Sequence, residues 1–431
     1  MITDLLFGGG RKILMIKQGS GASLSIQNAA STEPKGSLLG LFEAGLCGSL
    51  LYGVNLYFST NADINNPVVP IWWSIAKDVA LVLLFGYILL KLNAQRSLSV
   101  PLTLVLTLAF AASTAALCLL RFGVSGLTLS FAKNLGLYFA GGAFLGVAIA
   151  NRSPPSEIAF RMCRAIVVSI VVGIACLLLP VQSVDGRLYG TYGNPTSLAY
   201  AAFIAFALIT TFRSQIESVA FAFALGAIYV MSGSISLLVA AAGFLFLLSA
   251  MEFVHGRAVK PYVLQIAAIS VSVVLFGALL HYLNAPAKGF ERATMSIAST
   301  IQSDSITTRL TAFTLQGDLN YRRYDSFLLG IYKNFGLVPL LMYACVLASL
   351  AWQYIRTTRS RCQNTIAAAL ASILVLNPLL QHQLEIFPTN LLFGLLLGCS
   401  IVWLSHQREV MAPETSRHCV KQFSEAEMAQ D

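Results

Sequence analysis

Charged side chains are scarce in this sequence. Of its 431 residues, 11% are Asp, Glu, Lys or Arg, whereas a soluble domain carries about 25%. The eight cysteines include no CxxC pair and mostly fall in apolar runs, which indicates small buried residues rather than disulfides or metal ligands. These shortages exclude a disordered chain, a nucleic-acid-binding domain and an ordinary soluble enzyme.

Apolar residues are correspondingly abundant, at 56% of the chain with a mean hydropathy of +0.72. So few charges cannot cover so apolar a core, and lipid must therefore cover it. The sequence predicts an all-α polytopic membrane protein with about twelve transmembrane helices, of which the two between 218 and 252 are separated only by the short turn at 232–234. The predicted ranges are 38–58, 69–90, 98–120, 131–150, 165–181, 195–212, 218–232, 234–252, 262–283, 335–354, 365–382 and 389–405.

The two ends of the chain differ from the apolar middle. Residues 1–36 are rich in Gly and Ser and show no small-residue cleavage site after a short apolar core, which predicts a flexible tail rather than a signal peptide. Residues 406–431 are polar and predict a second tail. Residues 37–405 are the predicted transmembrane domain.

Lys and Arg orient the predicted helices. With both tails on the cytoplasmic side, 18 of the 28 Lys and Arg lie inside, 7 lie outside and 3 fall within or beside spans. This bias follows the positive-inside rule and predicts cytoplasmic termini. Much of the net charge of +9 is therefore topological and requires no acidic partner such as nucleic acid.

One long connection carries most of the outer cations. Five of the 7 lie in the predicted periplasmic loop at about 284–334. A loop of about fifty residues between helices is usually functional, and its cations oppose the orientation bias. An anionic ligand would explain them; the alternative is that one long loop simply carries average charge.

Another outer connection, residues 185–199, reads DGRLYGTYGNPTSLA. Its glycines and the Asn194-Pro195 pair predict a tight turn, with Pro195 in the first turn of the next helix. Arg187 would then lie near a helix N-terminus, and both groups favour anions such as phosphate. From the residues alone, a capped turn with a solvated arginine is the favoured explanation.

Three segments together resemble a known family. Residues 187–199 resemble the R-x-x-G-T-x-x-N-P-N-x-L-A signature of the O-antigen polymerase/ligase family of Wzy-like integral membrane glycosyltransferases, with Thr196 replacing the second Asn. Residues 305–309, SITTR, are similar to the family's S-x-x-x-R in the large periplasmic loop. Residues 324–340 resemble the family segment that precedes the next span, and the resemblance covers about residues 185–345.

The resemblance implies a metal-independent glycosyl transfer between two polyprenyl-diphosphate-linked oligosaccharides. Arg187 and Arg309 would stabilise the departing diphosphate, because arginine binds phosphate oxygens bidentately and stays charged. Asp325 would accept the proton of the attacking sugar hydroxyl. The remaining substrate-binding residues that we expect are Tyr192, Asn194, Arg322, Arg323 and Tyr324.

The sequence departs from the family pattern in two places. Ligases usually present a histidine near position 325, and none of the five histidines lies there, so the polymerase branch is favoured. The family's Ser-Arg pair after the seventh span is reduced here to Ser234-Ile235-Ser236. The alternatives are a ligase that transfers glycan to lipid A or a protein, and a transporter or flippase of an anionic lipid-linked substrate.

The same resemblance implies the setting of the protein. It predicts a bacterial inner membrane location, with the lipid bilayer, a chain-length regulator and a flippase as partners and no nucleic acid. No D-x-D motif and no His/Asp/Glu cluster occurs in the predicted outer segments. The sequence therefore predicts neither a metal site nor a cofactor.

A few other charged residues fall in unusual places. Lys77 and Asp78 lie inside the second apolar run, where charges are costly, and an interhelical pair is the favoured reading. We expect Lys133 to snorkel towards the membrane surface and Glu43 to be satisfied near the first span. Glu385, close to His382 in the last outer turn, is a weaker candidate for acid–base chemistry.

Overall fold

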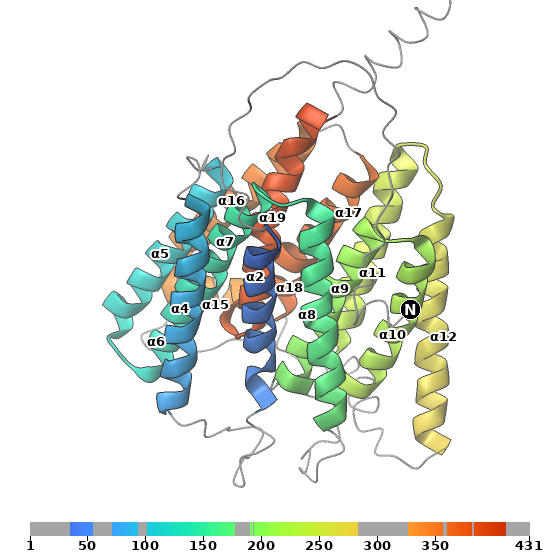
Figure 1. Cartoon of the computed structure of the whole chain (residues 1–431), viewed down its shortest axis with the longest axis horizontal. Coiled ribbons are helices and arrows are strands. Elements are labelled where there is room, and N and C mark those ends of the chain that lie inside the picture. The colour runs from blue at the N-terminus through green and yellow to red at the C-terminus, as the bar shows by residue number, and fades with distance from the viewer. Residues whose placement is uncertain are drawn as a thin grey trace, which may run out of the picture.

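The computed structural model of the protein describes residues 35–54, 71–93, 101–176, 190–192, 194–282, 326–356, 360–381 and 383–410. In these ranges the chain forms helices and no strand, and the long helices run side by side as a bundle (Figure 1). In chain order the helices are α2 (Lys35–Leu50), η1 (Leu51–Val54), α4 (Ile71–Asn93), α5 (Leu102–Phe122), α6 (Gly126–Lys133), the π-helix η2 (Asn134–Ala140), α7 (Gly141–Ala150), α8 (Pro155–Cys176), η3 (Gly190–Tyr192), α9 (Pro195–Phe212), α10 (Gln215–Ser232), α11 (Ile235–Val254), α12 (Lys260–Tyr282), α15 (Phe327–Phe335), α16 (Leu337–Ile355), α17 (Arg361–Ala371), the π-helix η4 (Ser372–Leu376), α18 (Asn377–Leu380), η5 (Gln383–Glu385) and α19 (Thr389–Val410).

The apolar ranges predicted from the sequence coincide with these helices. In the part of the chain that the structure describes, nine helical stretches are long and apolar enough to cross a membrane, and two shorter apolar helices cover 38–54 and 389–405. Helix α4 adds a further 23 residues. The prediction of an all-α polytopic membrane protein is confirmed, while the number of crossings and the periplasmic loop stay predictions.

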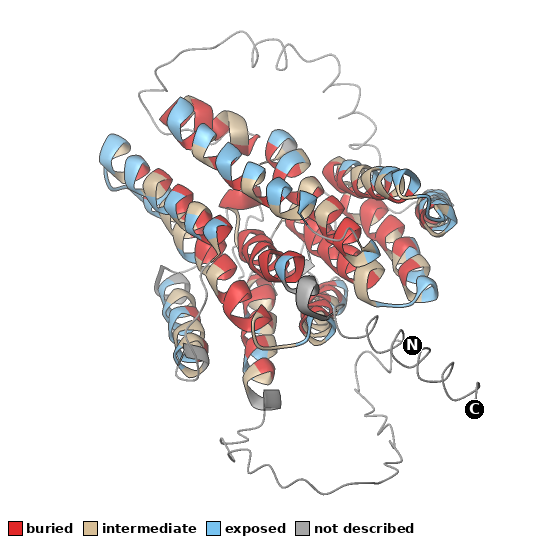
Figure 2. Ribbon diagram, turned by 90° about the horizontal axis from the view of Figure 1, so that it is seen from above, coloured by how far each residue is buried: buried red, intermediate tan, exposed pale blue. Residues whose placement is uncertain are grey.

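Helices α9 and α19 form the centre of the bundle. Seen from above, the fully buried segments gather in the middle and the half-exposed helices surround them (Figure 2). In α9, 78% of the residues are buried, and in α19 every residue from 389 to 404 is, whereas four residues of α12 are buried and its apolar surface faces outward. The helix that begins within the 187–199 motif therefore lies in the core, and its N-terminus has a fixed place.

Glycines bring α7 and α19 into close contact. Gly142 and Gly146 on α7 face Gly394 and Gly398 on α19, and a Cβ atom on any of them would meet backbone atoms of the other helix. Small residues spaced by four let helix backbones approach closely, which drives helix association in membranes. This contact holds the C-terminal helix in the core.

Helix α8 begins ten residues earlier than predicted, so Arg161 and Arg164 lie within the helix and not in a connection. Arg161 Nη1 lies 3.0 Å from Glu43 Oε2, and Arg164 Nε lies 3.1 Å from Glu43 Oε1. Glu157 pairs with Arg161 one turn away, at 3.1 Å. These pairs neutralise both arginines within the fold, and the expectation that Glu43 is satisfied is confirmed.

The turn at Gly233 separates α10 from α11. Gly233 has a φ of 61°, in the left-handed region, and its N–H donates to Tyr229 O at 2.8 Å. Glycine adopts this conformation without a steric cost, which makes it the usual residue after a helix C-terminus. The short turn at 232–234 therefore does divide two helices.

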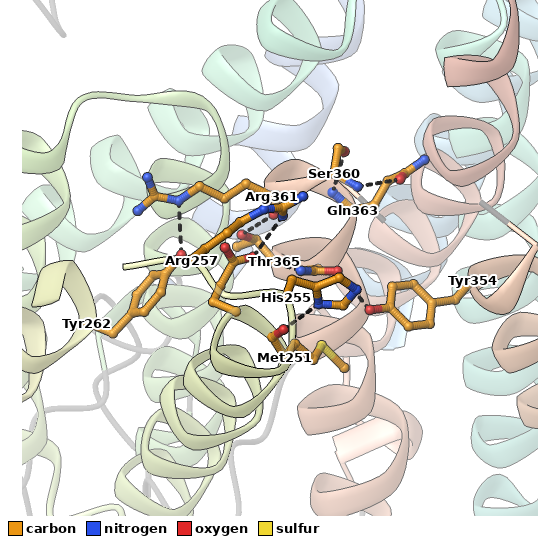
Figure 3. A network of polar contacts seen from close by, with 11 residues as sticks. Met251, His255, Arg257, Tyr262, Tyr354, Ser360, Arg361, Gln363 and Thr365 are labelled. Atoms are coloured by element: carbon orange, nitrogen blue, oxygen red, sulfur yellow. Dashed lines mark hydrogen bonds and ion pairs between the residues drawn. The ribbon is translucent and has the colours of Figure 1, made fainter. Parts of the chain in front are cut away.

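A polar network joins α11, α12 and α17 at the end of the bundle that is predicted to face the cytoplasm (Figure 3). The carboxylate of Glu252, 1% exposed, accepts a hydrogen bond from Asn364 Nδ2 at 2.7 Å and lies 3.4 Å from Arg257 Nη1. Arg361 Nε donates to the Tyr262 hydroxyl at 2.9 Å. The charged groups of this network contact one another within the chain, so we assign the network to helix packing.

The orientation predicted from the charge bias can be tested directly with reporter fusions. A reporter fused at residue 300 is expected to be active in the periplasm, and one fused after residue 410 in the cytoplasm, because Lys and Arg concentrate on the cytoplasmic side. Paired phosphatase and fluorescent-protein fusions would measure this. Cytoplasmic activity at residue 300 would overturn the assignment of any outer site.

Candidate functional site

Most of the residues predicted to carry the chemistry lie outside the described residues. The structure describes Tyr192 and Asn194 and the helices that follow the predicted motifs. The residues outside are Arg187, Arg309, Arg322, Arg323, Tyr324 and Asp325.

Asn194 and Tyr192 hold the start of α9. Asn194 has an extended backbone, its Oδ1 accepts from Thr196 N at 2.8 Å, and Pro195 occupies the first helical position. The Tyr192 hydroxyl lies 2.5 Å from Ser169 Oγ on α8. Burial raises the pKa of Tyr192, so its phenol stays protonated at neutral pH and is no general base. Both side chains serve here to fix the N-terminus of a core helix.

The N-termini of α9 and α15 are joined to one stretch of chain, residues 377–390, which comprises α18, η5 and the start of α19. We call it the 377–390 segment; its residue 382 lies outside the described residues. On α9, Ser197 Oγ donates to Gln383 Oε1 at 2.9 Å. At the start of α15, Phe327 N donates to Gln381 O at 3.1 Å.

Ser326 strengthens the second of these links. Its hydroxyl caps α15 by accepting from Leu329 N at 3.3 Å and donates to Pro378 O at 2.9 Å. Helix α15 was not predicted from the sequence. The two helices that begin within the predicted motifs, α9 and α15, thus have their first turns bonded to the same segment.

The 377–390 segment is also bonded to η2. Asn134 Nδ2 donates to Glu385 O at 2.6 Å, and Asn390 Nδ2 donates to Asn134 O at 3.0 Å. Asn134 is the first residue of the π-helix η2, and Asn390 supplies a donor to its carbonyl. Asn134, Glu385 and Asn390 are all buried. Glu385 therefore lies in a packed polar junction rather than on an open outer turn.

Next to this junction is a charged group that we call the lysine–aspartate cluster: Lys77 and Asp78 of α4, Lys133 of α6 and Tyr138 of η2. Lys133 Nζ lies 2.8 Å from Asp78 Oδ2, and Lys77 Nζ lies 3.2 Å from Asp78 Oδ1. The Tyr138 hydroxyl donates to Asp78 Oδ1. One carboxylate thus holds two ammonium groups and a phenol from three helical elements.

Three aromatic rings surround the Lys77 ammonium. Its Nζ lies 3.9 Å from the ring centroid of Phe387, 4.4 Å from that of Tyr52 and 5.1 Å from that of Tyr138. Ring faces attract cations, more strongly where water is scarce. Phe387 belongs to the 377–390 segment, so the lysine–aspartate cluster contacts the same segment as the starts of α9 and α15.

The sequence identified part of this cluster. Lys77 and Asp78 stand out as charges in an apolar run, and the prediction of an interhelical pair is confirmed, with Lys133 as the partner on the other helix. The Lys133 ammonium pairs with Asp78, and its snorkelling towards the membrane surface stays a prediction. Two lysines and one carboxylate near the same predicted membrane face were a signal for this pairing.

No metal site occurs in the ranges that the structure describes: they contain no group of three or more His, Cys, Asp or Glu side chains placed to hold an ion. The polar groups that the structure describes at this end of the bundle are the ammonium groups of Lys77 and Lys133, the carboxylates of Asp78 and Glu385, and amides, hydroxyls and backbone carbonyls. Such groups bind and orient anionic or sugar-like ligands through charge and hydrogen bonds.

The helices and their buried polar groups define the class of the molecule, an all-α polytopic membrane protein. Comparison adds no nearer relation, since no protein-family model, no curated protein and no solved structure matches the chain.

Proposed function

We propose that the protein polymerises polyprenyl-diphosphate-linked oligosaccharide repeat units into a surface or exported polysaccharide at the outer face of the bacterial inner membrane. One observation carries the proposal. Two of the three motifs that resemble the O-antigen polymerase/ligase family contain a helix N-cap, Asn194 and Ser326, and the starts of both helices are bonded to the 377–390 segment. Groups at helix N-termini favour anions.

The proposed reaction needs few groups. A hydroxyl oxygen of the acceptor repeat unit forms a bond to the anomeric carbon of the donor glycan while the bond from that carbon to the diphosphate oxygen breaks. The polyprenyl diphosphate leaves with the electron pair, and Arg187 and Arg309 stabilise its charge. Asp325 takes the hydroxyl proton. Attack from the face opposite the leaving group inverts the anomeric centre.

Substitution of the three proposed catalytic residues tests the function. Arg187→Ala, Arg309→Ala and Asp325→Asn are each expected to lower the turnover of polymer formation by about 100-fold or more, because each removes charge stabilisation or the proton acceptor. Arg187→Lys is also expected to lose most activity, since lysine lacks the planar fork. The measurement is polymer length and amount from purified lipid-linked repeat units.

Arg213→Ala is the matched control. Arg213 follows α9 at the opposite end from the motif, and its guanidinium lies 4.8 Å from the Phe160 ring centroid. This variant should polymerise at close to the wild-type rate. The proposal fails if Arg187→Ala and Arg309→Ala both make full-length polymer.

Two other functions are separated by the same assay. A ligase would need lipid A or a protein acceptor and would yield no polymer from repeat units alone. A transporter is favoured by one observation, the lysine–aspartate cluster, because ionisable groups inside a membrane bundle often mark transport pathways. A transporter would move the lipid-linked substrate between leaflets of proteoliposomes but would form no glycosidic bond in detergent.

A further inference from the structure

The lysine–aspartate cluster carries one more positive than negative charge. Lys77 and Lys133 are both within 3.2 Å of a carboxylate oxygen of Asp78, and among the described residues their side-chain contacts include no second acid. Tyr138 donates a hydrogen bond to the carboxylate and adds no negative charge. The cluster therefore holds a surplus cation that a single negative group would neutralise.

The cluster lies part-way along α4 and not at its first turn. Asp78 is seven residues into α4 from Ile71, which is about 10 Å along a helix. An unmatched charge within a membrane-spanning helix is costly, and residues that carry one are usually functional. The surplus charge therefore requires an explanation beyond the pairing of the helices.

Of the two lysines, Lys133 is the one open to a ligand. The Lys77 side chain is 12% exposed and its ammonium is surrounded by three rings, whereas the Lys133 side chain is 31% exposed. Both ammonium groups contact Asp78, Lys133 at 2.8 Å and Lys77 at 3.2 Å, and together they carry one charge more than the carboxylate neutralises. The more exposed Lys133 is the one that a further anionic acceptor can reach.

Lys133 opens towards the lipid side of the bundle. The residues one turn before and after it on the same helix face, Leu129 and Leu137, are both exposed. On α4, the apolar residues around Asp78, Ile75 and Val79, are exposed as well. The surface around Lys133 therefore suits a ligand with two parts. An anionic group would contact the ammonium, and an apolar chain would lie along the exposed apolar residues.

We infer that Lys133 binds a phosphate group carried on a lipid, which enters from the side of the bilayer between α4 and α6. Lys77 is a positioning residue that holds Asp78 and so keeps the charge of Lys133 available. Lysine binds phosphate as a compact point charge. The site is separate from the Arg187 and Arg309 motifs, and the inference rests on the proposed function only for the suggestion that the lipid is a polyprenyl diphosphate.

Ligand binding to the full-length protein in nanodiscs tests the site. A sugar-free polyprenyl diphosphate and phosphatidylglycerol are each titrated, and affinity is taken from the ligand-dependent rise in unfolding temperature. For at least one of these lipids, Lys133→Gln should weaken binding by about 10-fold, close to 1.4 kcal/mol. Lys133→Arg keeps the charge and should restore affinity, and unfolding without ligand shows that each variant is folded.

Lys91→Gln is the control, because Lys91 lies on α4 at the end opposite the cluster and its loss should leave binding unchanged. The lipid that depends on Lys133 identifies the natural headgroup. Unchanged binding of both lipids to Lys133→Gln would overturn the site, and so would inorganic diphosphate that binds as tightly as the lipids. Lys133-dependent binding without polymer formation would refute the polymerase and leave the lipid site standing.

Discussion

Replacing Gly398 with alanine is expected to disrupt assembly of the helix bundle. A methyl group at this position would collide with the backbone carbonyl group of Ala143, and the opposite residue on α7, Gly146, has no side chain to move aside. Because backbone atoms cannot rotate away, α7 and α19 would have to separate. Overpacking of this kind costs about 3 kcal/mol. The measurement is the unfolding temperature and the monodisperse fraction of a fluorescent fusion in detergent.

Gly277→Ala is the matched control for this substitution. Gly277 lies within α12, and nothing lies within 4 Å of an added Cβ atom. Alanine favours a helix over glycine by about 1 kcal/mol, so this variant should be as stable as the wild type or more so. If Gly398→Ala and Gly277→Ala unfold at the same temperature, the close contact of α7 and α19 does not hold the bundle.

The helices could be predicted from the sequence because each one is a long apolar run. The prediction failed where charges lie inside a helix. The charges of Arg161 and Arg164 predicted a connection before residue 165, yet α8 begins at Pro155. Both arginines form ion pairs with Glu43, which is more than a hundred residues away in the sequence. An ion pair between helices that are far apart in the sequence lowers the free-energy cost of placing an arginine in a membrane-spanning helix. No local sequence pattern reveals such a pair.

The candidate site was predictable only in part for the same reason. Lys77 and Asp78 were visible as charges in an apolar run, but the 377–390 segment was not visible as a junction. Its bonds with Ser197 and Asn134 join residues about two hundred positions apart and depend on side chains that occur everywhere in proteins. The resemblance to a family identified Arg187, Arg309 and Asp325 from motifs alone, and these residues stay predictions.

Replacing Asp78 with asparagine is the second large effect that we expect. Asparagine keeps the shape of the side chain but removes the only negative charge of the lysine–aspartate cluster, so Lys77 and Lys133 would face each other as two unpaired cations. Loss of one partner from a fully buried pair costs about 3 kcal/mol or more, because the remaining charge is left uncompensated; this is the upper end for the present cluster, since Asp78 and Lys133 are 19% and 31% exposed. Thermal unfolding of the variant in nanodiscs, compared with the wild type, measures this loss.

A double substitution shows whether charge is the cause. Lys133→Gln alone should change stability little, because Asp78 keeps Lys77 at 3.2 Å and the hydrogen bond from Tyr138. Added to Asp78→Asn, it removes one of the two unpaired cations and should recover part of the lost stability. Residues in one network show coupling energies of about 0.5–3 kcal/mol in such a cycle. Strict additivity would mean that Asp78 acts through packing, and the surplus charge assigned to Lys133 would then have no structural basis.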